Sequence, residues 1–395
     1  MFFFFFNFDD VKNTTPTRSA NKGEWSEVYT MFKLLGEGKL FAGDEKYNKI
    51  ENRFYPILNI IREEIIQKQK TDIYDYEVIH KDNNNYSSAS EFIIVKSNGQ
   101  ELLKMSAESF LEAAGHLLGL IKNGRGRSFK TSSKNEAFMK EVHCRNVKRD
   151  PWHKSDIELN MYDFAAQTDR VMGMSIKSLI GGAPTLLNTS DATLITYSVE
   201  GADFSDEQIN AINSITGNSK LKKRIDAIYQ KGAKIVYTDY ESQTFKNNLD
   251  IIDSALPKIL AETVLLYFSS KRVSSSPNLI SKIAEINPLN SQHEDLYKYY
   301  KAKYTRLLES SALGMYPAKP YDDSNDAKGY VVVRDDGDIV CYSFYDREMA
   351  RKHLFDNTKM DTPSSEKDGR KEYCKLYRSE DGSVKIQLNF QIRWK

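Results

Sequence analysis

Two short stretches of sequence, KSDIEL at residues 154–159 and MSIKS at residues 174–178, decide the fold of this chain. Apolar and polar residues alternate in both, which is typical of a β-strand with one buried face. The polar residues QTDR at 167–170 lie between them and suit a turn. The pattern therefore predicts an antiparallel β-hairpin.

The pairing within this hairpin determines which side chains meet. We expect the chain to bend at residues 166–167, which places Asp156 opposite Lys177. The same bend places Glu158 opposite Ser175. Because alternate residues of a strand share a face, all four side chains then lie on one face of the hairpin.

A carboxylate beside a lysine on one sheet face has two interpretations. In the first, the carboxylate holds a hard cation and the lysine positions an attacking water, as metal-assisted hydrolysis of a phosphodiester requires. In the second, Asp156 and Lys177 form an ordinary cross-strand ion pair that contributes less than about 1 kcal/mol. The spacing alone leaves both open.

Composition indicates a soluble globular protein. The chain has 395 residues, of which 40% are hydrophobic and 28% charged, so it can bury a large core. No apolar run is long enough to cross a bilayer, because the longest candidate, Ile259–Phe268, is short and contains Glu262. The phenylalanine run at residues 2–6 lacks the flanks of a signal peptide. The three cysteines form no CxxC pair. We therefore expect a cytoplasmic protein without a disulfide framework or a zinc module.

Basic residues concentrate between Lys122 and Arg149, where nine Lys or Arg residues accompany two Glu residues. The formal net charge of the whole chain is only +1, so the rest of the chain is acidic. A run of charge is most often a solvated helix face. Because this block leads directly into the predicted hairpin, it is also a candidate surface for the DNA backbone, with Arg125 and Arg127 among its contacts.

Periodic apolar residues predict further elements along most of the chain. The predicted helices cover 24–35, 106–121, a segment starting at the capping sequence of residues 133–136, another starting at that of residues 205–208, 220–229, most of 248–314, and 346–355. The predicted strands cover 57–61, 73–79, 92–95, 234–238, 329–333, 339–344, 373–377 and 384–394.

In the last predicted strand, residues 384–394, apolar and polar residues alternate, so the polar residues form a row on one face of the strand. Gln391 and Arg393 belong to this row, and side chains of their type can bind base edges through two hydrogen bonds. The row is equally typical of the solvated side of an antiparallel sheet.

Several of these segments occur in one order that resembles the HpaII family of type II restriction endonucleases, from about residue 20 to the C-terminus. They are NKGEWSE at 21–27, the Asp156 strand, SIKS at 175–178, TLLN at 185–188 and NFQIR at 389–393. The resemblance implies a restriction-endonuclease-like PD-(D/E)XK core, an α/β fold whose mixed central sheet is flanked by helices. Around that core we expect an N-terminal tail at 1–20, the nuclease core with helical insertions at 21–316, and a β-rich segment at 317–395 that packs on the core and carries DNA recognition.

The resemblance also implies an activity: Mg²⁺-dependent cleavage of double-stranded DNA at unmethylated CCGG, leaving 5′-phosphate ends. It assigns metal binding to Asp156 and the catalytic lysine to Lys177. The chain departs from the family core pattern at Ser175, where an acidic residue is usual. The missing carboxylate has three candidates, which are Glu158, Glu24 and Glu27, and the family position favours the helix that carries Glu24 and Glu27.

DNA recognition must come from other residues. The candidates are Lys154, Ser178, Thr185, Asn188, Gln391, Arg393, Arg125 and Arg127. A palindromic site favours a homodimer, and a restriction enzyme works beside a cognate DNA methyltransferase. Two alternatives remain: a DNA-binding protein without catalysis, and a nuclease of the same core with another DNA target.

Overall fold

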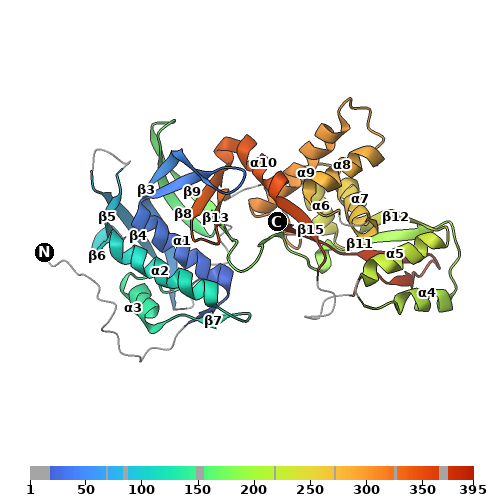
Figure 1. Cartoon of the computed structure of the whole chain (residues 1–395), viewed down its shortest axis with the longest axis horizontal. Helices are drawn as coiled ribbons and strands as arrows, with labels where there is room; N and C mark the ends of the chain where they lie inside the picture. Colours follow the sequence, from blue (N-terminus) through green and yellow to red (C-terminus); the bar gives the residue numbers. More distant parts are fainter. Residues whose placement is uncertain are drawn as a thin grey trace. The chain divides into compact units, whose positions relative to one another are not determined.

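The computed structural model describes residues 18–67, 70–82, 88–147, 155–217, 219–270, 273–323, 327–363 and 372–395 (Figure 1). They divide into two units. The first unit comprises the described residues of Met1–Pro184 and Asn325–Ala350, and the second comprises those of Thr185–Ser324 and Arg351–Lys395.

The first unit is built on a mixed sheet of nine strands. Parallel pairs join β9 to β13 and β14 to β2, and the other pairs are antiparallel. The strand order is β2 (Lys39–Gly43), β14 (Ile339–Ser343), β13 (Ala327–Val333), β9 (Thr168–Ser178), β8 (Ile157–Asp163), β3 (Lys49–Gln67), β4 (Lys70–His80), β5 (Ser90–Ser97) and β6 (Gln100–Ser106). The expectation of a mixed central sheet with helices is confirmed.

Strand β3 pairs with two different partners along its length. Its first half, up to Pro56, pairs with β2, and its second half, from Ile57, pairs with β8 and β4. Because β2 also begins the sheet, this extra pairing closes β2, β14, β13, β9, β8 and β3 into a ring. The strand predicted at 57–61 is therefore the central part of a much longer one.

Helices α1 (Lys22–Glu37) and α2 (Ala107–Asn123) pack against each other and against the sheet (Figure 1). Helix α1 begins with a capping box, in which Asn21 accepts from the Glu24 N–H and Glu24 accepts from the Asn21 N–H, and it ends at Gly38 with φ 68°. Its apolar face, including Trp25 and Phe32, is fully buried. The sequence prediction of this helix is confirmed.

Two smaller elements complete the first unit. Helix α3 (Ser133–Glu141) follows α2, and its N-cap is Ser132, one residue before the predicted position. Strands β1 (Ser19–Ala20) and β7 (Phe129–Lys130) pair with each other, so the end of the predicted N-terminal tail is part of the fold.

The predicted hairpin exists, but its predicted register is wrong by two residues. Glu158 pairs with Gly173, not with Ser175, and the last pair is Asp163 with Thr168. The reason is the turn, in which the Asp163 carboxylate accepts the N–H groups of residues 165 and 166 and moves the bend toward the N-terminus. Asp156 does not pair with Lys177, whose neighbour on β13 is Val332.

The second unit contains two small antiparallel sheets. One has the order β12 (Lys234–Tyr240), β11 (Ile195–Glu200), β17 (Val384–Leu388) and β16 (Leu376–Arg378), and the other has the order β10 (Thr185–Leu187), β18 (Gln391–Trp394) and β15 (Thr358–Asp361). Its helices are α4 (Asp206–Asn213), α5 (Lys220–Gln230), α6 (Gln243–Ile252), α7 (Leu256–Ser269), α8 (Ser276–Ile286) and α9 (Leu296–Ala312). Helix α10 (Arg347–Asn357) contains the boundary at residue 350.

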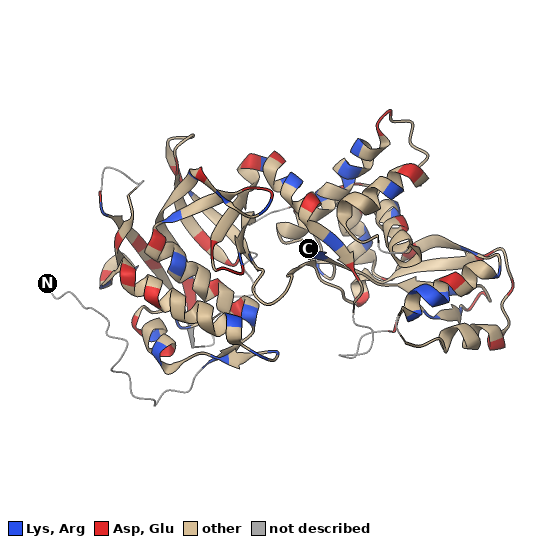
Figure 2. Ribbon diagram, viewed as in Figure 1, with Lys and Arg blue, Asp and Glu red and all other residues tan. Residues whose placement is uncertain are grey.

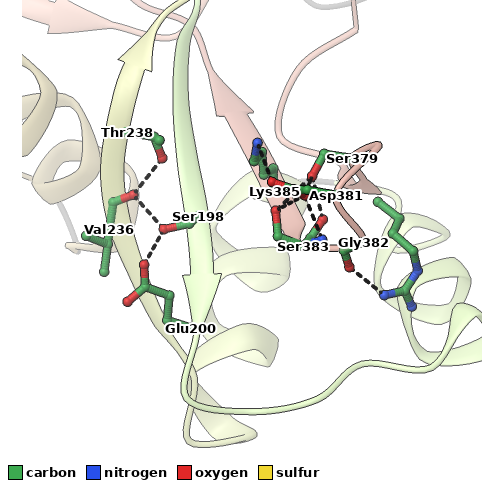
Figure 3. A network of polar contacts seen from close by, with 10 residues as sticks. Ser198, Glu200, Val236, Thr238, Ser379, Asp381, Gly382, Ser383 and Lys385 are labelled. Atoms are coloured by element: carbon green, nitrogen blue, oxygen red, sulfur yellow. Dashed lines mark hydrogen bonds and ion pairs between the residues drawn. The ribbon is translucent and has the colours of Figure 1, made fainter.

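Figure 3 shows two polar networks of the four-stranded sheet. On β11, Ser198 donates to Glu200 and to the carbonyl oxygen of Val236 on β12. In the turn between β16 and β17, the hydroxyl groups of Ser379 and Ser383 donate to Asp381 and hold the pKa of that carboxyl well below its ordinary value. Both networks stabilise local turns and strand pairs.

The prediction of one strand over 384–394 is wrong, because the segment divides into β17 and β18, which belong to different sheets. Asn389 causes the break. Its side chain accepts from the Thr193 hydroxyl at 2.7 Å and from the Phe390 N–H at 2.9 Å, and it donates to the Ser190 carbonyl oxygen. The alternation itself is correct, since the apolar residues at both sides of the break are buried.

The boundaries of the two units differ from the boundary expected between the nuclease core and the C-terminal segment, at residue 316. Residues 185–316 belong to the second unit, and β13 and β14 belong to the first. The parallel pairing of β13 with β9 accounts for this, because it draws the segment after residue 325 into the large sheet. No helix among the described residues is long and apolar enough to cross a membrane.

Candidate active site

Asp156 lies immediately before the first residue of β8, and two groups of β9 hold its carboxylate. The backbone N–H of Ile176 donates to Asp156 Oδ2 at 2.6 Å, and the hydroxyl of Ser175 donates to the same oxygen at 3.1 Å. The Asp156 N–H in turn donates to the carbonyl oxygen of Met174. Ser175 therefore acts as a donor to the aspartate.

A small pocket in the first unit brings Asp156 together with Glu27 of α1. Glu27 lies on the same helix face as Met31, one turn later, and both side chains contribute to the pocket wall. The lining residues are Glu27, Met31, Ile60, Ile61, Arg62, Asp156 and Ile157. Two carboxylates that come from distant parts of the sequence thus share one cavity.

The other two acidic candidates lie elsewhere. Glu24 is one turn closer to the N-terminus of α1, and its carboxylate caps the helix by accepting from the N–H and the side-chain amide of Asn21. Glu158 pairs with Gly173 and Ile61 in the sheet and is absent from the pocket lining. Within the described part of the chain, no group of three or more His, Cys, Asp or Glu side chains is arranged for a metal ion.

Lys177 lies near the end of β9, two residues beyond Ser175 and therefore on the same strand face. It is half-buried, and it is not among the residues that line the pocket. The next residue, Ser178, accepts a hydrogen bond at 2.8 Å from Ser26 of α1. This contact ties the helix that carries Glu27 to the strand that carries Lys177.

Sequence reasoning missed Arg62, because the predicted strand ended at Ile61. Arg62 lines the same pocket and forms a buried ion pair with Glu64, with 2.5 Å between Arg62 Nε and Glu64 Oε1. Burial alternates over residues 60–64 in the structure, but their sequence, IIREE, shows no alternation of apolar and polar residues, so no periodic signal marked Arg62.

Two candidate DNA contacts of the first unit follow the end of α2. Arg125 and Arg127 are exposed in the loop between α2 and β7, where Figure 2 shows a group of basic residues. Lys22 also reaches this region, since its ammonium group donates to the Lys122 carbonyl oxygen at 3.4 Å. Ser178 is half-buried against α1, and Lys154 lies outside the described residues.

The candidate contacts of the second unit share the three-stranded sheet. Thr185 pairs with Arg393 across β10 and β18. Gln391 and Arg393 both donate to the same oxygen of Asp361 on β15, at 3.1 and 3.3 Å. Asn188 follows β10 and is exposed. The structure therefore gathers these four side chains at one small sheet.

Comparisons with known proteins identify the family. The model of the HpaII restriction endonuclease family matches residues 21–394. The chain is also 37% identical over 378 residues to the type II restriction enzyme HpaII of Haemophilus parainfluenzae, which covers 95% of this chain and 98% of that enzyme. No solved structure matches the chain. The family predicted from the sequence motifs is confirmed, and the chain belongs to the HpaII family of type II restriction endonucleases.

Proposed function

We propose that this protein is a Mg²⁺-dependent restriction endonuclease that cleaves double-stranded DNA at unmethylated CCGG and leaves 5′-phosphate ends. The observation that carries the catalytic part is the pocket shared by Asp156 and Glu27 at the base of the β8–β9 hairpin. The DNA target rests on the family motifs, which run through nearly the whole chain.

The first unit carries the PD-(D/E)XK core in this proposal. Asp156 supplies the aspartate of the motif and Lys177 its lysine, while Glu27 replaces the carboxylate that is missing at Ser175. Glu27 is a better candidate than Glu24, whose carboxylate caps α1, or than Glu158, which does not line the pocket.

The residues present fit a magnesium site. Mg²⁺ is usually held by one or two carboxylates, with water and substrate phosphates as its other ligands, and the pocket offers the carboxylates of Asp156 and Glu27. When bound, Mg²⁺ polarises the scissile phosphate and lowers the pKa of a bound water.

The side chains of the hairpin prepare this chemistry. Ser175 and the Ile176 N–H hold Oδ2 of Asp156, so in this proposal the other oxygen, Oδ1, binds the cation. Lys177 orients the attacking water and offsets the negative charge that develops on the phosphate. The water forms a bond to phosphorus as the bond to the 3′ oxygen breaks, so no covalent enzyme intermediate is needed.

Recognition of the bases falls to the small sheet of the second unit in this proposal. Asn188, Gln391 and Arg393 have the side-chain types that bind base edges, and each good contact contributes about 1–3 kcal/mol of discrimination. The enzyme acts as a homodimer on its palindromic site, in the cytoplasm, beside a methyltransferase that protects the host DNA.

The test is to incubate the purified protein with plasmid DNA and Mg²⁺, beside Asp156→Ala and Lys177→Ala and a plasmid methylated at CCGG. We expect discrete fragments from unmodified DNA only, and none with either variant. A folded wild type that binds DNA without cutting it would instead favour a binding protein. Fragments at other sites would favour a nuclease with a different target.

A further inference from the structure

Arg62 is the one cation in the wall of the pocket that holds Asp156 and Glu27, among the residues the structure describes there. Its side chain is buried, at 6% exposure, and its partner Glu64 is fully buried. Burial disfavours the charged form, yet Cys144 and Glu64 raise the pKa of Arg62 above its ordinary value. The guanidinium therefore stays charged at any working pH.

The hydrogen bonds of Arg62 are unequal in strength. Nε donates to Glu64, and Nη2 donates to the Asn146 carbonyl oxygen. Within the described part of the chain, the partner of Nη1 is the thioether sulfur of Met31, at 3.9 Å. Sulfur is a weak acceptor, so among the described residues this end of the buried guanidinium has only a weak partner beside the pocket.

A buried ion pair in a strand seldom stabilises a protein more than apolar residues at the same positions would. Replacing such a pair by apolar residues of similar volume is often neutral or stabilising. Here Glu64 also accepts the N–H and the side-chain amide of Asn146, at 2.8 and 2.7 Å, so the pair is held rigidly. A rigid, preoriented donor facing a reaction pocket is the arrangement that stabilises a developing charge.

We propose that Arg62 is a further catalytic residue, whose Nη1 donates to a non-bridging oxygen of the scissile phosphate. Met31 Sδ occupies this donor until DNA enters. In the reaction, the water oxygen bonds to phosphorus while the bond to the 3′ oxygen breaks. The water loses a proton to solvent and the 3′ oxygen gains one. Charge gathers on the non-bridging oxygens, where Arg62 acts. This inference rests on the proposed function.

The principal test is single-turnover cleavage by the double variant Arg62→Met/Glu64→Met, which removes both charges together, so that neither charge is left buried without the other. The variant also removes the partners of Asn146, so its thermal midpoint is measured in parallel. Removing one donor to a developing oxyanion typically slows a reaction about 100- to 1000-fold, and we expect a loss of this size. Arg351→Met/Glu309→Met in the second unit is the matched control, because it removes another Arg–Glu ion pair whose carboxylate is buried. We expect the control to cleave at the wild-type rate.

A second measurement distinguishes direct contact between Arg62 and the phosphate from a structural role. One non-bridging oxygen of each phosphate in the site is replaced by sulfur in turn, in either stereochemical position. In the wild type, one such substitution weakens the contact with Arg62 and slows cleavage. The sulfur penalty is the ratio of the cleavage rate of the unmodified duplex to that of the sulfur-substituted duplex. In the double variant this ratio should fall toward one, since the contact is already lost, whereas a purely structural role would leave the ratio unchanged. Arg62→Lys, which keeps the charge, should show the same reduced penalty if the double variant does not fold.

The outcomes distinguish this inference from the proposed function. Full cleavage by the folded double variant, or an unchanged sulfur penalty, would overturn the role of Arg62 while Asp156→Ala could still show a nuclease. A wild type that cuts no DNA would overturn both.

Discussion

Replacing Ser175 by alanine tests whether this hydroxyl orients Asp156 for the proposed cleavage. The change removes the donor that lies 3.1 Å from Asp156 Oδ2 and leaves the Ile176 N–H, at 2.6 Å, in place. It adds no bulk, and Ser175 is buried in β9, so the strand pairing should survive.

The expected size follows from the bond that is lost. A hydrogen bond to a charged group contributes roughly 1.5–3 kcal/mol, and the surviving second donor favours the lower end of that range. Since about 1.4 kcal/mol corresponds to a tenfold change in rate, Ser175→Ala should cleave about tenfold more slowly than the wild type.

The assay is single-turnover cleavage of a short duplex containing CCGG at saturating protein and Mg²⁺, with the thermal midpoint measured in parallel. Ser198→Ala is the matched control, because Ser198 also donates from a strand to a carboxylate, that of Glu200, at 2.6 Å (Figure 3). A wild-type rate in folded Ser175→Ala, or an equal slowing in Ser198→Ala, would refute the reasoning.

Three further predictions concern the thiols, the second unit and the basic loop. Burial raises the pKa of all three thiols, to about 11 or 12 from 9.0, so a thiol reagent at pH 8 should label them only after unfolding (Cys144, Cys341, Cys374). Because the folded state keeps these thiols protonated to a higher pH than the unfolded state does, their contribution to stability is present below pH 9 and is lost as the pH rises through these values. Unfolding midpoints measured between pH 7 and 11 would check this. Asn389→Ala removes three hydrogen bonds at the break between β17 and β18, and urea unfolding should show a loss of about 2 kcal/mol, whereas an unchanged midpoint would contradict this role. The double variant Arg125→Ala/Arg127→Ala should reduce, by about 2, the steepness with which the logarithm of the DNA-binding constant falls with the logarithm of the salt concentration, for any duplex. A slope equal to that of the wild type would show that this loop does not contact the DNA backbone.

Local signals predicted the elements that position the site. The apolar face of α1 located that helix, and alternation located β8 and β9. The register could not be read from alternation, because a shift of two residues keeps every side chain on its face. It depends on the Asp163 turn, whose hydrogen bonds no periodicity reveals.

The assembly of the pocket was beyond local reasoning for another reason. Whether Glu24 or Glu27 meets Asp156 depends on the rotation of α1 about its axis, which its packing against the sheet and against α2 decides. The closure of the ring through β2 and β3 likewise joins segments whose sequences show no sign of each other. Arg62 was missed because the end of its strand was placed too early.

The most direct test of the account is the Mg²⁺ concentration that gives half-maximal single-turnover cleavage in Glu27→Gln, with Glu24→Gln as control. Glutamine can replace glutamate in a capping box, so Glu24→Gln should keep α1 intact and require the same Mg²⁺ concentration as the wild type. Glu27→Gln should require at least about ten times more, or should not cleave, because it removes one of the two carboxylates of the pocket. A wild-type requirement in Glu27→Gln, together with a lost response in Glu24→Gln, would contradict the assignment of this pocket as the metal centre.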